Sequence, residues 1–232
     1  MPLPDAQICV VPATPRATVR IAGLYAITPR ETDTNRLMRR VGRVLDGGCR
    51  LVQYRCKDAS PEHRVSQAAA LSKLCESAGA ALIVNDDAWL ASQVGAAGVH
   101  LGRDDSGVAE ARAMLPHGVV GVSCYDSLER ALRLRAEGAD YVAFGSFFPS
   151  AVKPGAVRPP LGLLGEARAS LDCAVVAIGG VTRARAPQLL AAGAHALAVI
   201  TDLFEAEDPA ARAAEYVEFF QAAEGGHSTL VP

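Results

Sequence analysis

The sequence lacks the features that mark several large classes of protein. None of its apolar runs reaches the roughly 20 residues that a membrane-spanning helix needs. The chain does not open with a basic region followed by an apolar stretch, so we expect no signal peptide. A net charge of −2 gives no argument for binding nucleic acid or another polyanionic surface. We therefore expect neither a nucleic-acid partner nor a membrane.

The cysteines also lack a pattern. The sequence contains six, with no C-x-x-C pair among them (Cys9, Cys49, Cys56, Cys75, Cys124 and Cys173). Scattered cysteines argue against a disulfide framework and against a zinc site, and they fit free thiols in a reducing compartment. We therefore expect a cytoplasmic protein.

What the chain does contain is a regular alternation of strand and helix patterns, with half of its 232 residues apolar. Short apolar runs predict strands at 21–28, 50–55, 81–84, 98–101, 119–123, 141–144, 174–178 and 196–200. Helices are predicted at about 33–46, 61–78, 88–94, 107–115, 128–137, 161–170, 183–192 and 209–223. Eight such units predict a closed (β/α)₈ TIM barrel of the α/β class. The alternative, an open dinucleotide-binding sheet, is weakened because no G-x-G-x-x-G turn follows the first strand.

The domain organisation follows from the same pattern. No linker divides the strand–helix units, so residues 21–224 are predicted to form one domain. Residues 1–20 contain several prolines and no clear period, and we interpret them as a loosely ordered arm, with a short strand at 8–11 as one option. Residues 225–232 are predicted to be a frayed tail.

Carboxylates follow two neighbouring strands at the points where these strands end. Asp86 comes directly after the third strand, and Asp105 lies in the loop after the fourth. The C-terminal ends of barrel strands open onto a common site, and oxygen ligands at such a loop suit Mg²⁺. The alternative is that these acids cap the following helices, which we favour for Asp87 and Asp104.

Other polar residues gather at the same predicted strand ends. Gln53, Arg55 and Lys57 alternate along the end of the second strand, so they can share a face and hold a polyanion. The alternative is that Arg55 and Lys57 are solvated loop residues. Ser123 ends the fifth strand, and the long loop after the sixth carries Ser150 and Lys153, for which a plain surface lysine is the alternative.

The last two strands end in residues suited to a phosphate. Gly179-Gly180 follows strand seven and Thr201 follows strand eight, where TIM barrels frequently bind phosphate. Two other candidates are weaker. We expect His100 to be a satisfied barrel histidine rather than a ligand, and Cys124 has no base placed beside it by the sequence.

Taken together, the ordered motifs resemble the thiamine-phosphate synthase family over about 23–204. The motifs are Gln53-x-Arg55-x-Lys57, Asn85-Asp86, Gly98-Val99-His100-Leu101-Gly102 with Asp105, Gly121-Val122-Ser123, Ala139-Asp140-Tyr141, Phe148-Pro149-Ser150 with Lys153, and Ile178-Gly179-Gly180. Each motif is weak alone, but the ordered set is specific.

The resemblance implies an activity and a role for each matching residue. The family joins hydroxymethylpyrimidine diphosphate to thiazole phosphate and releases diphosphate, with Mg²⁺, by a dissociative substitution. The resemblance places Mg²⁺ on Asp86 and Asp105, and catalytic roles on Lys57, Ser123 and Lys153. It places the pyrimidine diphosphate on Gln53, Arg55, Lys57, Asn85, Ser123 and Lys153. It places the thiazole phosphate on Ser150, Ala151, Val152, Gly180, Ile200 and Thr201.

The chain departs from the family pattern at Val152, where the family commonly has a threonine, and at Cys56, where it often has an acid. Two rival functions remain open. One is a thiazole tautomerase-like homologue, which tends to lose the diphosphate-binding residues that this chain keeps. The other is a non-catalytic phosphate-ligand sensor on the same barrel. A symmetric homo-oligomer is compatible with the sequence.

Overall fold

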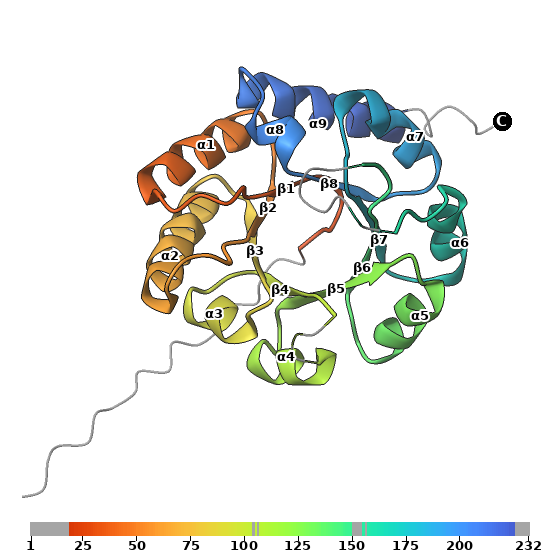
Figure 1. Cartoon of the computed structure of the whole chain (residues 1–232), viewed down its shortest axis with the longest axis horizontal. Helices are drawn as coiled ribbons and strands as arrows, with labels where there is room; N and C mark the ends of the chain where they lie inside the picture. The colour runs from red at the N-terminus through yellow and green to blue at the C-terminus, as the bar shows by residue number, and fades with distance from the viewer. Residues whose placement is uncertain (1–18, 104, 106, 150–154, 156, 226–232) are drawn as a thin grey trace, which may run out of the picture.

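The computed structural model describes residues 19–103, 105, 107–149, 155 and 157–225. Its strands form a closed parallel barrel in which each strand pairs with its neighbour in sequence and β8 pairs with β1 (Figure 1). The predicted TIM barrel is therefore confirmed. The strands are β1 (Gly23–Ile27), β2 (Leu51–Tyr54), β3 (Ala81–Asn85), β4 (Gly98–Leu101), β5 (Val119–Tyr125), β6 (Tyr141–Phe144), β7 (Ala174–Ile178) and β8 (Ala196–Val199).

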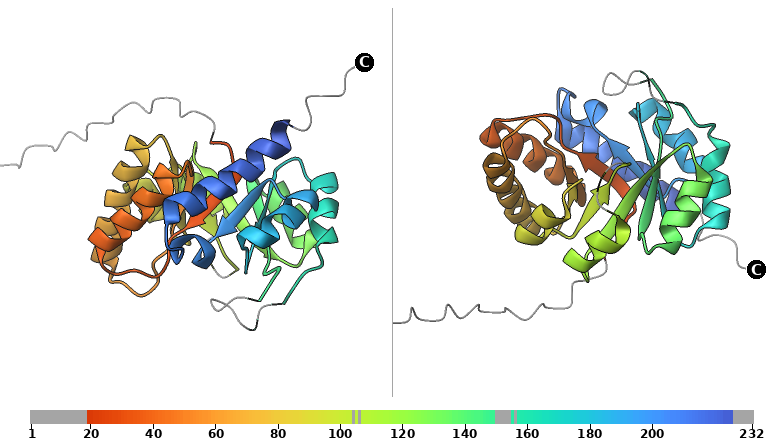
Figure 2. Two further views of the ribbon diagram at one scale, coloured as in Figure 1. Left: turned by 90° about the horizontal axis from the view of Figure 1, so that it is seen from above. Right: turned by 60° about the horizontal axis from the view of Figure 1, so that its bottom comes forward.

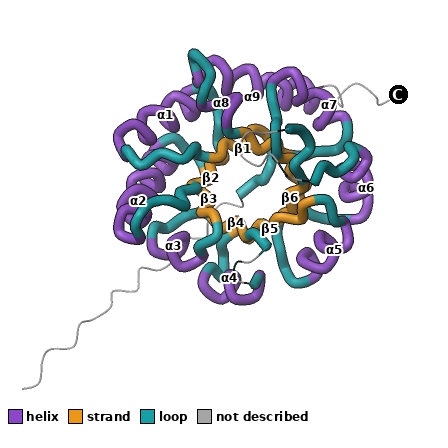
Figure 3. The backbone as a smooth tube through the Cα atoms, in the orientation of Figure 1, coloured by secondary structure: helices purple, strands orange, loops and turns teal. Residues whose placement is uncertain are grey.

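The helices surround this barrel as an outer ring (Figure 3). They are α1 (Thr34–Asp46), α2 (Pro61–Ser77), α3 (Ala88–Gln93), α4 (Val108–Met114), α5 (Leu128–Ala136), α6 (Gly162–Ser170), the 3₁₀ helix η1 (Arg183–Arg185), α7 (Ala186–Ala191), α8 (Thr201–Phe204) and α9 (Pro209–Gly225). Figure 2 shows α9, in dark blue, lying along the outside of the barrel beside α1. Within the described residues, no helix has both the length and the apolar character needed to cross a membrane.

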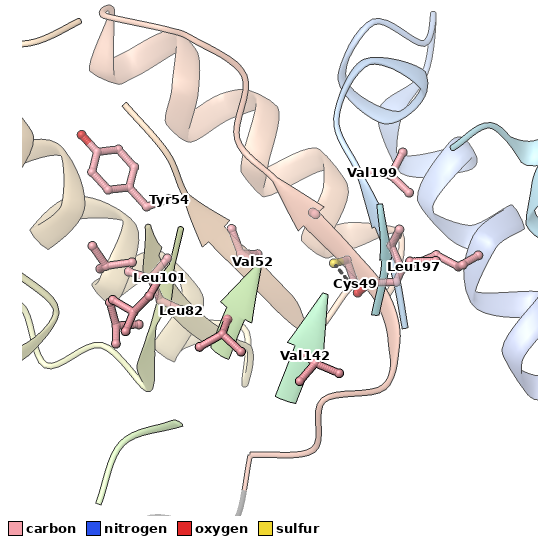
Figure 4. Packing of buried hydrophobic residues seen from close by; sticks show 14 of the residues in the cluster. Cys49, Val52, Tyr54, Leu82, Leu101, Val142, Leu197 and Val199 are labelled. Carbon is pink, nitrogen blue, oxygen red and sulfur yellow. Dashed lines mark hydrogen bonds between the residues drawn. The ribbon is translucent and has the colours of Figure 1, made fainter. Parts of the chain in front are cut away.

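Two apolar layers follow from the alternation of side chains along the strands. Residues that point outward pack under the helices, among them Val52, Leu82 and Val142 (Figure 4). Residues that point inward form a second cluster inside the barrel, which includes Tyr25 and Tyr141. The inner layer fills the barrel floor, so a site can open only at an end of the strands.

Side-chain caps begin several helices where the sequence predicts them. Asp33, Ser60 and Asp87 each accept a hydrogen bond from a backbone N–H in the first turn of α1, α2 and α3, respectively. The prediction that Asp87 is a cap is therefore confirmed. The matching prediction for Asp104 lies outside the described residues, and α4 begins after Gly107 without a side-chain cap.

Several strands are one to three residues shorter than predicted, and the short helix α8 was not predicted. Three further differences concern β5, α7 and α9. Strand β5 continues past residue 123 because a register shift lets Tyr125 pair with Phe144 of β6. The helix predicted at 183–192 is split into η1 and α7, since Pro187 has no N–H to give to the carbonyl of Arg183. Helix α9 extends to Gly225, a residue that the sequence places in the predicted tail. Residues 1–18 and 226–232, and with them most of the predicted arm and tail, lie outside the described residues.

Candidate functional site

A cavity of about 650 Å³ opens at the C-terminal ends of the strands. It is lined by residues from many strand ends and the loops that follow them, as in other TIM barrels. Of the predicted site residues, this cavity contacts Gln53, Arg55, Asn85, Ser123, Gly180, Ile200 and Thr201. A second cavity of about 200 Å³ adjoins it and is lined by Lys57 and Asp86, with Asn85 lining both. The sequence therefore identified residues that the fold brings together.

Alternate residues at the end of β2 line the main cavity, as predicted for Gln53 and Arg55. Tyr54 and Cys56 belong to the layer under the helices and, together with Lys57, line the second cavity. Cys56 thus faces away from the main cavity. Lys57 reaches toward β3, and its Nζ lies 2.7 Å from Oδ2 of Asp86. The Lys57 side chain is half exposed and forms an ion pair with this carboxylate, so its role in the site stays a prediction.

The two predicted metal ligands converge beside Gly102. A Cβ built on Gly102 would lie 2.9 Å from an Asp105 oxygen and 3.8 Å from an Asp86 oxygen. Asp105 also accepts a hydrogen bond from the backbone N–H of Gly102. Asp86 holds a φ of 67°, a left-handed conformation that costs a non-glycine residue energy and is concentrated at functional sites. The fold therefore holds both carboxylates at one point of the mouth.

The charges of these two acids are coupled. Burial raises the pKa of Asp105, and the hydrogen bond with Asp86 raises it further. Burial also acts to raise the pKa of Asp86, but the hydrogen bonds from Lys57 and Asp105 outweigh it, so the net shift is downward. Two carboxylates this close repel each other when both are ionised. A divalent cation bound between them would offset that repulsion.

The donor set fits Mg²⁺ rather than a softer metal. Both ligands are carboxylates, and no group of three or more His, Cys, Asp or Glu residues that could hold a metal occurs in the part of the chain that the structure describes. Mg²⁺ is commonly held by one or two carboxylates together with waters and substrate phosphates. Two carboxylates beside a cationic cavity match that arrangement.

We expect Asp105→Asn to stabilise the metal-free protein. An asparagine at this position can still accept from the Gly102 N–H and can donate to Asp86, while the repulsion between carboxylates disappears. Relief of about 1 kcal/mol would raise Tm by about 2–4 °C in a chain of this size. Thermal unfolding in EDTA measures the effect. A lower Tm for the variant than for wild type would show that the two carboxylates do not oppose each other.

A chain of hydrogen bonds crosses the barrel floor and ends at a predicted site residue. Nε2 of Gln53 donates to Oη of Tyr25 at 2.8 Å, and Oη of Tyr25 lies 2.9 Å from Oη of Tyr141. Nδ1 of His100 lies 2.9 Å from that Tyr141 oxygen, and its Nε2 lies 2.9 Å from Oγ of Ser123. His100 is therefore a satisfied barrel histidine, as predicted. The chain links Gln53 with Ser123 across the barrel.

The direction of this chain sets what Ser123 can do. Because Gln53 donates to Tyr25, the Tyr25 hydroxyl can donate to Tyr141, and the Tyr141 hydroxyl can donate to Nδ1 of His100. In this arrangement each tyrosine hydroxyl donates once and accepts once, and the neutral His100 ring carries its proton on Nε2. His100 then donates to Ser123, whose own proton is left for an acceptor in the cavity. Ser123 is thus prepared as a donor to an anion.

The ends of β7 and β8 form the opposite side of the mouth. Gly179, Gly180, Ile200 and Thr201 all line the main cavity there. Gly179 and Gly180 have positive φ angles, and a Cβ on Gly180 would lie 2.6 Å from the carbonyl oxygen of Pro149. Glycine is therefore required here for the turn and for packing against the loop after β6. The predicted residues Ser150, Ala151, Val152 and Lys153 of that loop lie outside the described residues.

Sequence reasoning missed several residues that line the main cavity. Tyr25 belongs to the buried chain, and Arg103 lies over the ring of Tyr125 with its guanidinium carbon 4.5 Å from the ring centroid. Arg185 also lines the cavity. Arg103 follows β4 in the βα loop, so the rule that collected Arg55 would have found it, whereas Arg185 lies in η1, within a segment that the sequence predicts as helix. The Cys124 thiol is not a candidate nucleophile, because burial raises its pKa to about 12.

Comparison with known proteins identifies the relatives of this chain. The family model for thiamine monophosphate synthase matches residues 24–203. A thiamine-phosphate synthase of Azoarcus sp. (strain BH72) is 54% identical over 202 residues, which cover 87% of this chain and 98% of that protein. One of Bordetella avium (strain 197N) is 52% identical over 193 residues, covering 81% of this chain and 89% of that protein. The solved structure of thiamine phosphate pyrophosphorylase from Pyrococcus furiosus superposes with a TM-score of 0.79 at 31% identity, covering 87% and 96% of the two chains.

Proposed function

The chain belongs to the thiamine monophosphate synthase family, and from this premise we propose that its cavity joins hydroxymethylpyrimidine diphosphate to thiazole phosphate. The products are thiamine phosphate and diphosphate, and the enzyme is a transferase of thiamine biosynthesis. One observation carries the proposal. Cationic and polar residues of β2, β3 and β5 converge on one cavity, with a carboxylate pair at its edge. That arrangement suits a diphosphate held against a divalent cation.

The substrates divide the mouth between them. Arg55 and Lys57 supply positive charge on the β2 and β3 side, and Asn85 and Ser123 supply neutral hydrogen-bonding groups. We assign the diphosphate to these residues. The turn at Gly180 and the end of β8 at Ile200 and Thr201 lie across the cavity, and we assign the thiazole phosphate to that side.

Asp86 and Asp105 would hold Mg²⁺ in this enzyme. The bound cation supplies charge neutralisation for the departing diphosphate. Lys57 contacts Asp86 directly, so its ammonium lies where it can bind both a carboxylate and a phosphate oxygen. The support for this assignment is the pair of oxygen ligands that converge beside Gly102.

The substitution needs no protein nucleophile. The bond between the exocyclic methylene and the diphosphate oxygen breaks, and both electrons leave with the diphosphate. The aminopyrimidine ring carries the resulting positive charge until the thiazole nitrogen donates its lone pair and forms the new carbon–nitrogen bond. Arg55, Lys57 and Ser123 stabilise the negative charge that builds on the leaving group. Apolar residues of the inner barrel, including Ile27, Ala143 and Ile178, line the cavity. They exclude water that would otherwise compete with the thiazole nitrogen for the positively charged pyrimidine.

The coupling assay tests this function. Purified protein is incubated with both substrates, with Mg²⁺ or with EDTA, and thiamine phosphate and diphosphate are quantified. We expect equal amounts of the two products, and only when the metal is present. A protein that binds the substrates without converting them would be the sensor. Conversion of a thiazole phosphate without consumption of the pyrimidine diphosphate would indicate the tautomerase-like homologue.

We expect Tyr141→Phe to lower kcat by about two- to tenfold. The substitution removes the hydroxyl between Tyr25 and His100, so nothing in the chain fixes the His100 proton on Nε2 and Ser123 loses its orientation. Tyr54→Phe is the control for stability, because it removes a buried hydroxyl that donates to Gln67 between β2 and α2 and leaves the hydrogen-bonded chain intact, although the Tyr54 side chain also lines the second cavity. Both variants should lose a similar amount of thermal stability. Wild-type kcat for Tyr141→Phe would show that the chain serves stability alone.

A further inference from the structure

Arg185 lines the main cavity on the side formed by the ends of β7 and β8. Among the residues that the structure describes, no cation was predicted from the sequence on that side. Arg185 ends η1, five residues after the Gly180 turn that follows β7. The same side contains Gly180, Ile200 and Thr201. These are the residues that we assign to the thiazole phosphate, so Arg185 borders that subsite.

Two contacts fix the guanidinium of Arg185. Its Nη1 donates to the carbonyl oxygen of Gly180 at 2.7 Å, and its Cζ lies 4.6 Å from the centroid of the Phe148 ring. An arginine stacked on a ring and hydrogen-bonded at one edge has lost much of its rotamer freedom before a ligand arrives. The guanidinium carries five N–H donors in a planar fork, which matches the oxygens of a phosphate.

The position of Arg185 separates it from the cations of the diphosphate side. In the closed order of eight strands, β7 is four strands from β3, so it lies across the barrel from Asp86 (Figure 1). Arg55 and Arg103, which also line the main cavity, follow β2 and β4. Among the cavity-lining residues that the structure describes, Arg185 is therefore the one cation on the β6–β8 side.

Each of the two substrates brings a phosphate group to the cavity. Arg55 lines the cavity on the side that we assign to the diphosphate, and Arg185 lines it on the side that we assign to the thiazole phosphate. We propose that Arg185 binds the phosphate of the thiazole substrate and determines the preference for a phosphorylated over an unphosphorylated acceptor. The proposal rests on the proposed function, since it names a ligand for the second substrate of that reaction.

The chain offers a matched control two residues away. Arg183 belongs to the same short helix η1, is exposed, and places its Nε 3.3 Å from Oε2 of Glu215 in α9. Arg183 does not line the main cavity. Arg183→Met therefore removes one guanidinium from η1 without removing charge from the subsite.

The test compares Arg185→Met, Arg185→Lys and Arg183→Met in steady-state kinetics with each substrate varied in turn. The thiazole alcohol, which lacks the phosphate, is measured as an alternative acceptor and as a competitive inhibitor against the thiazole phosphate. We expect Arg185→Met to raise KM for the thiazole phosphate by about ten- to a hundredfold, the usual value of a hydrogen bond between charged groups. KM for the pyrimidine diphosphate and the inhibition constant of the alcohol should stay within about twofold of wild type. Arg185→Lys should recover part of the loss, and Arg183→Met should behave as wild type.

Two results would overturn the proposal. Equal weakening of the thiazole phosphate and the thiazole alcohol would mean that Arg185 only supports the Gly180 turn. An unchanged KM for the thiazole phosphate would mean that its phosphate binds elsewhere. Failure of the proposed function is distinguishable from both, because wild-type protein would then form no thiamine phosphate.

Discussion

Asp86→Asn is expected to lower kcat by about a hundredfold or more while the protein remains folded. Asp86 is one of the two carboxylates beside Gly102. It also forms an ion pair with Lys57, whose Nζ lies 2.7 Å from Oδ2 of Asp86. Its loss leaves one carboxylate for Mg²⁺ and leaves Lys57 without its partner. Removing a group that stabilises developing charge typically costs 10²–10³ in rate. The measurement is single-turnover formation of thiamine phosphate across a range of Mg²⁺ concentrations.

The neighbouring acid provides the control for this variant. Asp87 caps α3 through the Leu90 N–H and pairs with Arg64, and an asparagine caps a helix about as well. Asp87→Asn makes the same chemical change one residue away and should retain activity within a few-fold. If Asp86→Asn turned over as fast as Asp87→Asn at limiting Mg²⁺, the metal assignment would be wrong.

Lys57→Ala is expected to lower kcat by about a hundredfold, with a smaller change in KM for the pyrimidine diphosphate. The ammonium of Lys57 lies between the carboxylate of Asp86 and the space assigned to the diphosphate. Negative charge on the leaving group grows as the carbon–oxygen bond breaks, so a cation there stabilises the transition state more than the bound substrate. The measurement is kcat and KM with each substrate varied at saturation of the other.

Lys73 gives the comparison for Lys57. It is an exposed residue of α2 and does not line either cavity, so Lys73→Ala should match wild type in both parameters. A different pattern would contradict the account. If Lys57→Ala changed only KM for the thiazole phosphate, Lys57 would belong to the other subsite.

The barrel could be predicted from the sequence because each of its units is specified locally. Apolar runs of strand length, helix caps such as Ser60 and Asp87, and glycines such as Gly79 at helix ends all point to the same alternation. One of the errors occurs where tertiary pairing decides. The extension of β5 to Tyr125 depends on a register shift against β6, which no pattern within residues 119–125 contains.

The part of the candidate site that could be predicted consists of residues at the C-terminal ends of strands. Gln53, Arg55, Asn85 and Ser123 line the main cavity because parallel strands bring their C-terminal ends to one mouth. The hydrogen-bonded chain was not predictable, since it depends on which inward-facing residues meet across the barrel. Gly121 shows this dependence, because it pairs with Tyr141 across the β5–β6 register and a Cβ there would collide with the Tyr141 ring.

The central claim is that the carboxylate pair at the barrel mouth binds the metal that neutralises the diphosphate. Crystals grown with Mn²⁺ in place of Mg²⁺ and with the pyrimidine diphosphate test it directly through anomalous scattering. We predict an anomalous peak about 2.1 Å from oxygens of both Asp86 and Asp105, with diphosphate oxygens completing the coordination and extending toward Arg55 and Lys57. A diphosphate bound on the Gly180 side of the cavity, or Mn²⁺ away from both carboxylates, would contradict the account.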